Sequence, residues 1–222
     1  MAPPISPAVL HTVPLFASVP EEQLRTLATM LTRRSTTRGS IIMAAGDPTD
    51  SLYIILSGRL KVMMSDADGK EVILSILGPG EFFGEMGLID DNPRSASVVA
   101  IEPCELLSIT RRDFRKCMAD NAEIAMAVMR GLVRRLREAD RKIGSLALLD
   151  VYGRVARLLL DMSETVDGQK MVTKRLPKQD IAKMIGASRE MVSRVMKDLQ
   201  TGGFIEMRGS TILLRDNIVL PE

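Results

Sequence analysis

Residues 177–199 read PKQDIAKMIGASREMVSRVMKDL, and this stretch predicts two helices joined by a short turn. Pro177 suits the first turn of a helix, because an N–H at that position would have no intrahelical partner. Gly186 suits the end of that helix, since glycine adopts a left-handed cap without strain. Ser188 is a good N-cap for the next helix, and Glu190 lies in its first turn. Helix, short glycine turn and helix together indicate a helix-turn-helix motif.

The second predicted helix has an apolar face and a polar face. The apolar positions follow the spacing i, i+3, i+4, i+7 and are Val192, Val195, Met196 and Leu199. The residues left outward, together with the cap, are Ser188, Arg189, Glu190, Ser193, Arg194 and Lys197. In a helix-turn-helix the second helix enters the major groove of DNA, with its first residues at the base edges.

The outward residue types suit base and phosphate contacts. Arginine is a natural bidentate partner of guanine, and glutamate accepts from cytosine N4. Lys197, farther along the helix, is better placed for a phosphate. The alternative is that these charges form only a solvated helix face. The formal net charge of the whole chain is +2, so bulk charge does not decide between the two interpretations.

Downstream, Arg208-Gly209-Ser210 separates two short apolar runs and predicts a hairpin, which indicates a winged variant of the motif. Upstream, we expect a helix over about 152–163 and a short strand near 171–175. The segment 150–222 is therefore predicted to be a winged helix-turn-helix domain.

The segment 112–149 contains no proline and is predicted to be a long helix. Its apolar residues step by four and three and are Ala125, Met129, Leu132, Leu136, Ala139, Ile143 and Leu146. One interpretation is an amphipathic helix packed on its own domain. Strict heptad spacing with charged flanks favours a parallel two-helix dimer, so we expect a homodimer.

Residues 1–111 are predicted to be an irregular lead over 1–20, a short helix, and then an antiparallel β-roll. From Ile41 to Ile109, short apolar runs alternate with turns rich in Gly, Pro, Asp and Asn. No helical crossover separates the runs, which favours antiparallel pairing. The expected fold class is therefore α+β, with a jelly-roll-like N-terminal domain.

Residues 78–98 read GPGEFFGEMGLIDDNPRSASV and predict an anion site. A glycine-flanked turn opens a short helix and leaves backbone N–H groups free near residues 84–88, a stretch that includes Gly84 and Met86. Arg94 adds a planar fork and Ser95 a hydroxyl, while Glu85 is suited to accept from a ribose hydroxyl. The structural alternative is an Arg94–Glu85 ion pair.

Composition excludes several function classes. The 222 residues include one histidine and two cysteines, so we expect no catalytic histidine cluster, no disulfide framework and no metal site. No apolar run reaches the roughly 18 residues of a membrane span, and the N-terminus lacks the features of a signal peptide. The sequence therefore predicts a cytoplasmic protein that is not an enzyme.

The chain resembles the CRP/FNR family of bacterial transcription regulators over about residues 15–215. The resemblance lies in the turns Gly46-Asp47 and Ser57-Gly58, the cassette FGEMGL with Arg94-Ser95-Ala96, the hinge segment LALLDV with Gly153-Arg154, and Gly186-Ala187-Ser188-Arg189-Glu190. It implies a homodimer with a cyclic-nucleotide-binding β-roll, a dimer helix over 112–149 and a winged helix-turn-helix.

The resemblance also implies roles for particular residues. In cAMP-binding relatives the positions of Gly84, Glu85, Arg94 and Ser95 hold the ribose and cyclic phosphate. The positions of Arg189, Glu190 and Arg194 read TGTGA-like half-sites in palindromic double-stranded DNA, and RNA polymerase is the expected further partner. The N-terminal cysteine cluster of the iron–sulfur branch and the sensor histidine of the haem branch are absent from this sequence.

One departure from the family concerns the base. Two adjacent hydroxyl residues on the dimer helix contact adenine in cAMP-binding members, whereas this chain has Ala139 and Asp140. A carboxylate only accepts hydrogen bonds, and guanine offers N1–H and N2–H₂ side by side. The effector is therefore hypothesised to be cAMP, or a guanine nucleotide such as cGMP or cyclic di-GMP. The alternative is that Ala139 is a heptad residue and Asp140 a solvated flank.

Two other readings are open. A constitutive regulator with the same fold would need no small molecule, although the intact cassette argues against it. A kinase regulatory subunit would share the roll, but the helix-turn-helix would then have no explanation.

Overall fold

The computed structural model describes residues 5–174 and 176–215, apart from the side chain of Leu15. The chain forms two compact units, Met1–Arg135 and Leu136–Glu222, and each is described by itself. Among the described residues, no helix combines the length and apolar character needed to span a membrane.

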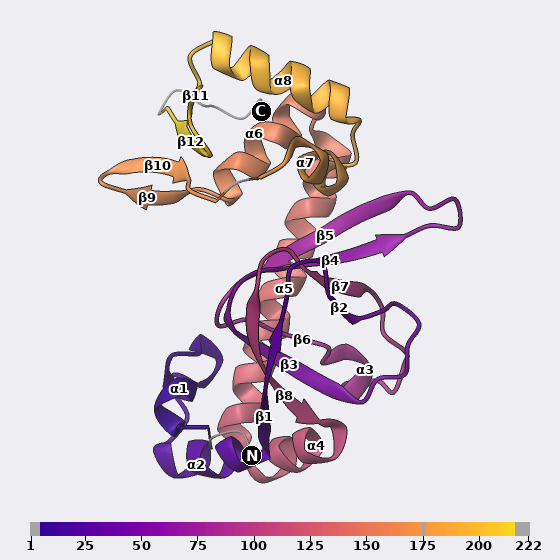
Figure 1. The fold of residues 1–222 in the computed structure, drawn as a ribbon, viewed down its shortest axis with the longest axis vertical. Coiled ribbons are helices and arrows are strands. Elements are labelled where there is room, and N and C mark those ends of the chain that lie inside the picture. The colour runs from indigo at the N-terminus through magenta and orange to yellow at the C-terminus, as the bar shows by residue number, and fades with distance from the viewer. Residues whose placement is uncertain (1–4, 175, 216–222) are drawn as a thin grey trace. The chain divides into compact units, whose positions relative to one another are not determined.

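The first unit contains two four-stranded sheets (Figure 1). One has the order β1-β8-β3-β6 and the other β2-β7-β4-β5, and every pair is antiparallel. The strands are β1 (Leu31–Thr36), β2 (Ile41–Met43), β3 (Ser51–Ser57), β4 (Leu60–Ser65), β5 (Glu71–Leu77), β6 (Phe82–Phe83), β7 (Ser97–Ala100) and β8 (Cys104–Thr110). The predicted antiparallel β-roll is confirmed.

Apolar side chains from both sheets close one core of this unit. Tyr53 and Ile55 of β3 pack in the same cluster as Leu60 of β4 and Leu77 of β5. Tyr53 stacks on Phe83 of β6 with ring centroids 5.2 Å apart. Because β3 is buried along most of its length, its apolar run is nearly continuous and does not alternate.

The N-terminal lead is helical where it was expected to be irregular. It forms α1 (Pro7–His11) and a 3₁₀ turn η1 (Pro14–Phe16), and the short helix predicted after the lead is confirmed as α2 (Glu21–Met30). Leu10, Val13 and Phe16 are fully buried in the second core cluster of the unit. Burial of these three large apolar side chains stabilises the short helical turns, although the prolines had indicated an irregular backbone.

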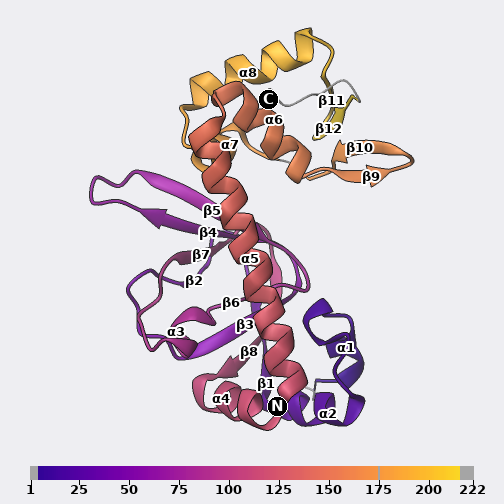
Figure 2. The ribbon, with the colours of Figure 1, turned by 180° about the vertical axis from the view of Figure 1, so that it is seen from behind.

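The stretch 112–149, expected as one helix, is two helices, α4 (Arg111–Asp120) and α5 (Ala122–Leu148). Asn121 divides them with an extended backbone, φ −136° and ψ 94°. The first part of α5 runs along the sheets (Figure 2) and buries Ile124 and Val128 in the core. Heptad residues farther along the helix stay exposed, Leu136 at 62% and Ile143 at 64%.

The described residues of the second unit form three helices after α5 and a four-stranded antiparallel sheet with the order β11-β12-β10-β9 (Figure 1). Its elements after α5 are α6 (Val151–Asp161), β9 (Glu164–Val166), β10 (Gln169–Val172), α7 (Lys178–Ile185), α8 (Arg189–Thr201), β11 (Ile205–Arg208) and β12 (Thr211–Leu214). The strand expected near 171–175 is β10, which starts earlier, and Arg175 lies outside the described residues.

Candidate functional site

The cassette is the turn after β6 that leads into the short helix α3 (Met86–Ile89). Gly84 has φ +85°, a conformation that disfavours any side chain. A Cβ at this position would lie 2.6 Å from Arg94 Nη1 and 3.0 Å from the Ser51 carbonyl oxygen. The cassette therefore requires glycine at residue 84, both for the backbone angle and for the space that the arginine occupies.

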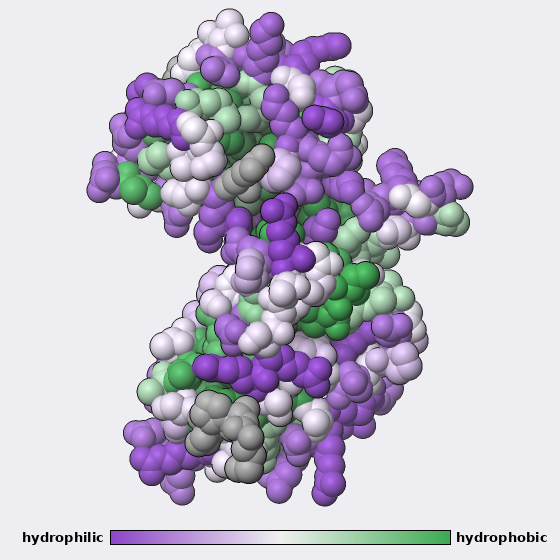
Figure 3. Space-filling view, viewed as in Figure 1, coloured by the Kyte–Doolittle hydropathy of each residue, from purple (hydrophilic) through white to green (hydrophobic). Residues whose placement is uncertain are grey.

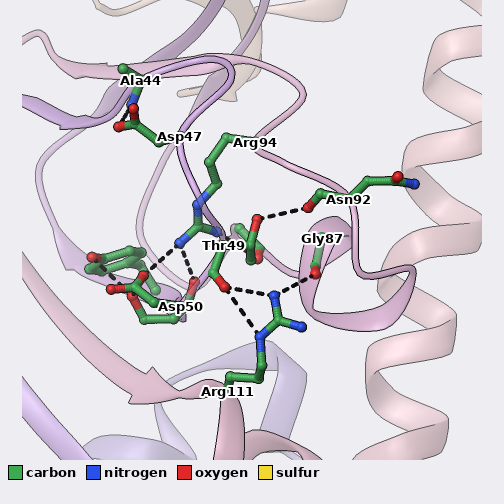
Figure 4. A network of polar contacts seen from close by, with 11 residues as sticks. Ala44, Asp47, Thr49, Asp50, Gly87, Asn92, Arg94 and Arg111 are labelled. Carbon is green, nitrogen blue, oxygen red and sulfur yellow. Dashed lines mark hydrogen bonds and ion pairs between the residues drawn. The ribbon is translucent and has the colours of Figure 1, made fainter.

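Arg94, labelled in Figure 4, contacts this turn, and its side chain is only 4% exposed. Its Nη1 donates to the carbonyl oxygen of Gly84 at 2.9 Å. Its Nη2 donates to the carbonyl oxygen of Ser51 at 2.7 Å and to Oδ1 of Asp50 at 3.1 Å. Hydrogen bonds from the Ser51 hydroxyl and the Arg94 guanidinium hold the pKa of the Asp50 carboxyl below its usual value.

Glu85 is paired with an arginine that the sequence analysis did not assign to the site. The suggested Arg94–Glu85 pair is wrong, because Arg135 of α5 donates to Glu85 Oε1 at 2.8 Å. The Glu85 side chain is 3% exposed. Arg135 also donates to the carbonyl oxygen of Phe82, and its guanidinium lies 4.6 Å from the centre of the Phe82 ring. The cassette is thereby joined to α5.

The other two cassette residues are exposed at its surface. The Ser95 hydroxyl lies 3.7 Å from the Met86 sulfur, to which it donates. Both side chains are accessible to solvent, Met86 at 53%. The structure therefore brings Gly84, Glu85, Met86, Arg94 and Ser95 together, with Glu85 and Arg94 buried and the other polar group, Ser95, exposed.

A second arginine supports α3 from the start of α4 (Figure 4). Arg111 donates to the carbonyl oxygens of Thr49 at 2.6 Å and Gly87 at 3.2 Å, and it also contacts Asp91. Arg115, one helical turn later, donates to Asp91 at 2.6 Å. Sequence reasoning missed these contacts, although two arginines four residues apart at a helix start were a visible signal.

Ala139 and Asp140 are exposed on α5, one helical turn after Arg135. They lie in the second unit, and their assignment to a nucleotide base stays a prediction.

The helix-turn-helix has the predicted caps and core. Gly186 ends α7 in the left-handed conformation, with φ +66°. The Ser188 hydroxyl accepts from the backbone N–H of Met191 at 3.1 Å. The apolar face of α8 is buried through Val192, Val195, Met196 and Leu199. The local prediction for this motif is confirmed.

The outer face of α8 is polar, and the region of α8 in Figure 3 is mostly hydrophilic. Arg189, Glu190, Arg194 and Lys197 are exposed, and Ser193 is half-buried. Within the described residues, the three cations of this face make no ion pair. The Arg208-Gly209-Ser210 turn joins β11 to β12 as expected, and Arg208 pairs with Glu206 at 2.8 Å.

Arg154 of α6 contacts the C-terminal end of α7, the first helix of the helix-turn-helix. Its Nη1 donates to the carbonyl oxygen of Ile185 at 2.9 Å, where α7 ends. A cation at a helix C-terminus is favoured by the macrodipole. The α6 helix is itself capped by Asp150, which accepts from the N–H of Gly153 at 2.8 Å.

Both cysteines are free and buried. Burial raises the pKa of the Cys117 thiol to about 11 and also raises that of Cys104. In the part of the chain that the structure describes, no cluster of His, Cys, Asp and Glu is suited to hold a metal ion.

Comparisons with known proteins agree with this arrangement. Residues 33–121 match the family model described as a cyclic nucleotide-binding domain, and residues 153–218 match a Crp-like helix-turn-helix domain. The CRP-like cAMP-activated global transcriptional regulator of Mycobacterium tuberculosis is 34% identical over 213 residues, covering 94% of this chain and 95% of that protein. Vfr of Pseudomonas aeruginosa, a cAMP-activated global transcriptional regulator, is 38% identical over 82% of this chain and 88% of its own.

Two solved structures are also similar. The c-di-GMP responsive global regulator CLP of Xanthomonas campestris has a TM-score of 0.77 at 31% identity, covering 89% of this chain and all of that one. The catabolite activator protein of Thermus thermophilus has a TM-score of 0.55 at 32% identity, covering 93% and 96% of the two chains. These relatives are transcription regulators and not enzymes.

Proposed function

The chain belongs to the CRP/FNR family of transcription regulators, and on that premise we propose that it is a homodimer whose sequence-specific DNA binding is controlled by a cyclic nucleotide. The observation that carries the proposal is the buried Arg94, held directly beneath the Gly84 turn in a chain that also presents the polar face of α8. The Arg94 site suits an anionic ligand, and the polar face of α8 suits the major groove of DNA.

In this proposal the cyclic phosphate lies against Arg94 and Ser95, and the ribose against Glu85. Arginine provides a planar fork for a phosphate, and Ser95 provides an exposed hydroxyl donor. Glu85 is acceptor-only and suits a ribose hydroxyl. Ligand contact at Glu85 would therefore change the Glu85–Arg135 ion pair, and the change would act on α5, the helix that carries Arg135.

Two effector classes follow from different observations. The M. tuberculosis and P. aeruginosa relatives are cAMP-activated, which supports cAMP. Asp140 in place of a hydroxyl residue suits the donor edge of guanine, and the relative in X. campestris is c-di-GMP responsive, which supports a guanine nucleotide. Calorimetry of the purified protein against cAMP, cGMP and cyclic di-GMP at fixed salt distinguishes them.

The exposed heptad residues of α5 support a homodimer. Leu136, Ile143 and Leu146 are more than half exposed, yet they follow the a/d spacing of a two-stranded coiled coil. The first turns of the same helix bury Ile124 and Val128 in the core of the first unit, whereas these three exposed residues lie farther along the helix. A second copy of the chain is the partner that supplies a matching seam along α5.

A dimer would place two α8 helices in successive major grooves, about 34 Å apart on palindromic DNA. In this proposal the segment 1–111 senses the ligand, 112–149 dimerises and 150–222 binds DNA through Ser188, Arg189, Glu190, Ser193, Arg194 and Lys197. RNA polymerase and a cytoplasmic location are the expectations for such a regulator. The ligand acts only through its different affinity for two conformations.

The experiment that tests this function is a DNA-binding titration with and without each nucleotide. Nucleotide-dependent binding to a TGTGA palindrome supports the proposal. Equal, tight binding without any nucleotide would favour the constitutive regulator.

A further inference from the structure

Arg94 leaves an incoming anion no free pair of donors. A guanidinium presents two edges that donate two parallel hydrogen bonds, Nη1 with Nη2 and Nε with Nη2, so each edge needs an N–H of Nη2. Both N–H groups of Nη2 are in use, one on the Ser51 carbonyl at 2.7 Å and one on Asp50 Oδ1 at 3.1 Å. A phosphate therefore binds in bidentate fashion only after one of these acceptors leaves.

The two acceptors differ in their freedom to leave. Ser51 opens strand β3 and is paired with Thr110 of β8, so the sheet fixes its carbonyl group. The Asp50 side chain is 83% exposed, and rotation of its carboxylate into water breaks the hydrogen bond from the Ser51 hydroxyl at 2.7 Å but disturbs no backbone pairing. Figure 4 shows the carboxylate beside the guanidinium, on the loop that precedes β3.

We propose that Asp50 is an internal competitor for the ligand phosphate. Its carboxylate neutralises Arg94 when no ligand is present, and it must withdraw when a cyclic phosphate takes the same donors. Asp50 thereby sets the ligand concentration at which the site fills. This inference rests on the proposed function, since it assigns a further residue to the same anion site.

If Asp50 competes with the ligand, its removal should strengthen ligand binding. If Asp50 instead positions Arg94, its removal should weaken ligand binding. Without Asp50, Arg94 still donates to the carbonyl oxygens of Ser51 and Gly84, and its own backbone N–H still donates to Asp47 O at 2.9 Å. The guanidinium is therefore held in place by groups of the fold, and the Asp50 charge is not needed to aim it. Removing that charge is expected to strengthen ligand binding.

The test is calorimetry on Asp50→Asn in the full-length protein, with the nucleotide among cAMP, cGMP and cyclic di-GMP that binds the unaltered protein most tightly. Loss of a charge pair whose carboxylate is exposed predicts a dissociation constant about two- to fivefold lower. Asp50→Ala gives a second measurement in the same direction, and thermal melting checks that both variants are folded.

Asp47→Asn is the matched control. This residue carries a carboxylate on the same loop, but its Oδ2 accepts from the backbone N–H of Ala44 at 3.3 Å and not from Arg94. Tighter binding by Asp50→Asn alone supports the proposal.

Three results would overturn it. Unchanged or weaker binding by folded Asp50→Asn would contradict competition while leaving the proposed function intact. If Asp47→Asn strengthened nucleotide binding equally, the effect would come from the overall charge of the loop and not from the Asp50–Arg94 contact. If neither the unaltered protein nor Asp50→Asn bound any of the three nucleotides, the proposed function itself would fail, and this inference with it.

Discussion

Arg135 of α5 donates to the buried carboxylate of Glu85 at 2.8 Å, across 50 residues of sequence. This contact gives the first prediction. Removing the guanidinium in Arg135→Met leaves a carboxylate that is 3% exposed without its partner, which costs about 3 kcal/mol in free energy of unfolding. Urea unfolding of the two proteins measures this loss in free energy of unfolding. Arg134→Met, at an exposed neighbouring position, is the control, and equal stability of the two variants would contradict the assigned role of the pair.

Arg94→Lys tests the phosphate contact. Lysine keeps the positive charge but loses the planar fork, so nucleotide affinity is expected to fall at least about tenfold while the dimer persists. Calorimetry and sedimentation measure the two properties. Nucleotide affinity equal to that of the unaltered protein would remove Arg94 from the site.

The seam on α5 predicts the oligomeric state. Ile143→Asp places a charge at a position that is 64% exposed within one chain, so the fold of the monomer should be preserved. In a coiled-coil dimer the same charge lies in the apolar seam, and dissociation into monomers at micromolar concentration is expected. Sedimentation velocity checks this. The control Arg141→Asp changes an exposed position away from the seam and should remain dimeric.

Arg189 and Lys197 are expected to act differently on DNA. Arg189→Ala should relax the sequence preference and cost about 1–3 kcal/mol per half-site, because a bidentate contact to a base edge is lost. Lys197→Ala should weaken binding to all sequences and reduce its salt dependence. Anisotropy titrations with matched and scrambled sites separate the two. A uniform loss for Arg189→Ala would place that side chain on phosphate.

Local features of the fold were predictable from sequence. The left-handed Gly186, the Ser188 cap and the buried face of α8 each depend on residues within a few positions of one another. The antiparallel sheets follow from short apolar runs separated by turns. Leu10, Val13 and Phe16 were a local signal as well, since their spacing by three fits the short helical turns that bury them.

Contacts between distant segments were not predictable in this way. Asp50 and Arg94 are 44 residues apart, and backbone hydrogen bonds between Arg94 and the loop at Gly46 and Asp47 bring them together. The break at Asn121 was hidden because helical periodicity continues on both sides of it. In the sequence, Arg135 is one of several charged residues that flank the heptad positions, and no neighbouring residue indicates its contact with Glu85.

The central claim is that a cyclic nucleotide controls DNA binding, and one titration tests it most directly. Fluorescence anisotropy with a labelled TGTGA palindrome, at fixed salt, measures affinity with no nucleotide and with cAMP, cGMP or cyclic di-GMP. At least one nucleotide is expected to change the DNA affinity severalfold or more in the unaltered protein, and Arg94→Lys should need at least about tenfold more of that nucleotide for the same change. The same affinity under all four conditions in the unaltered protein would contradict it.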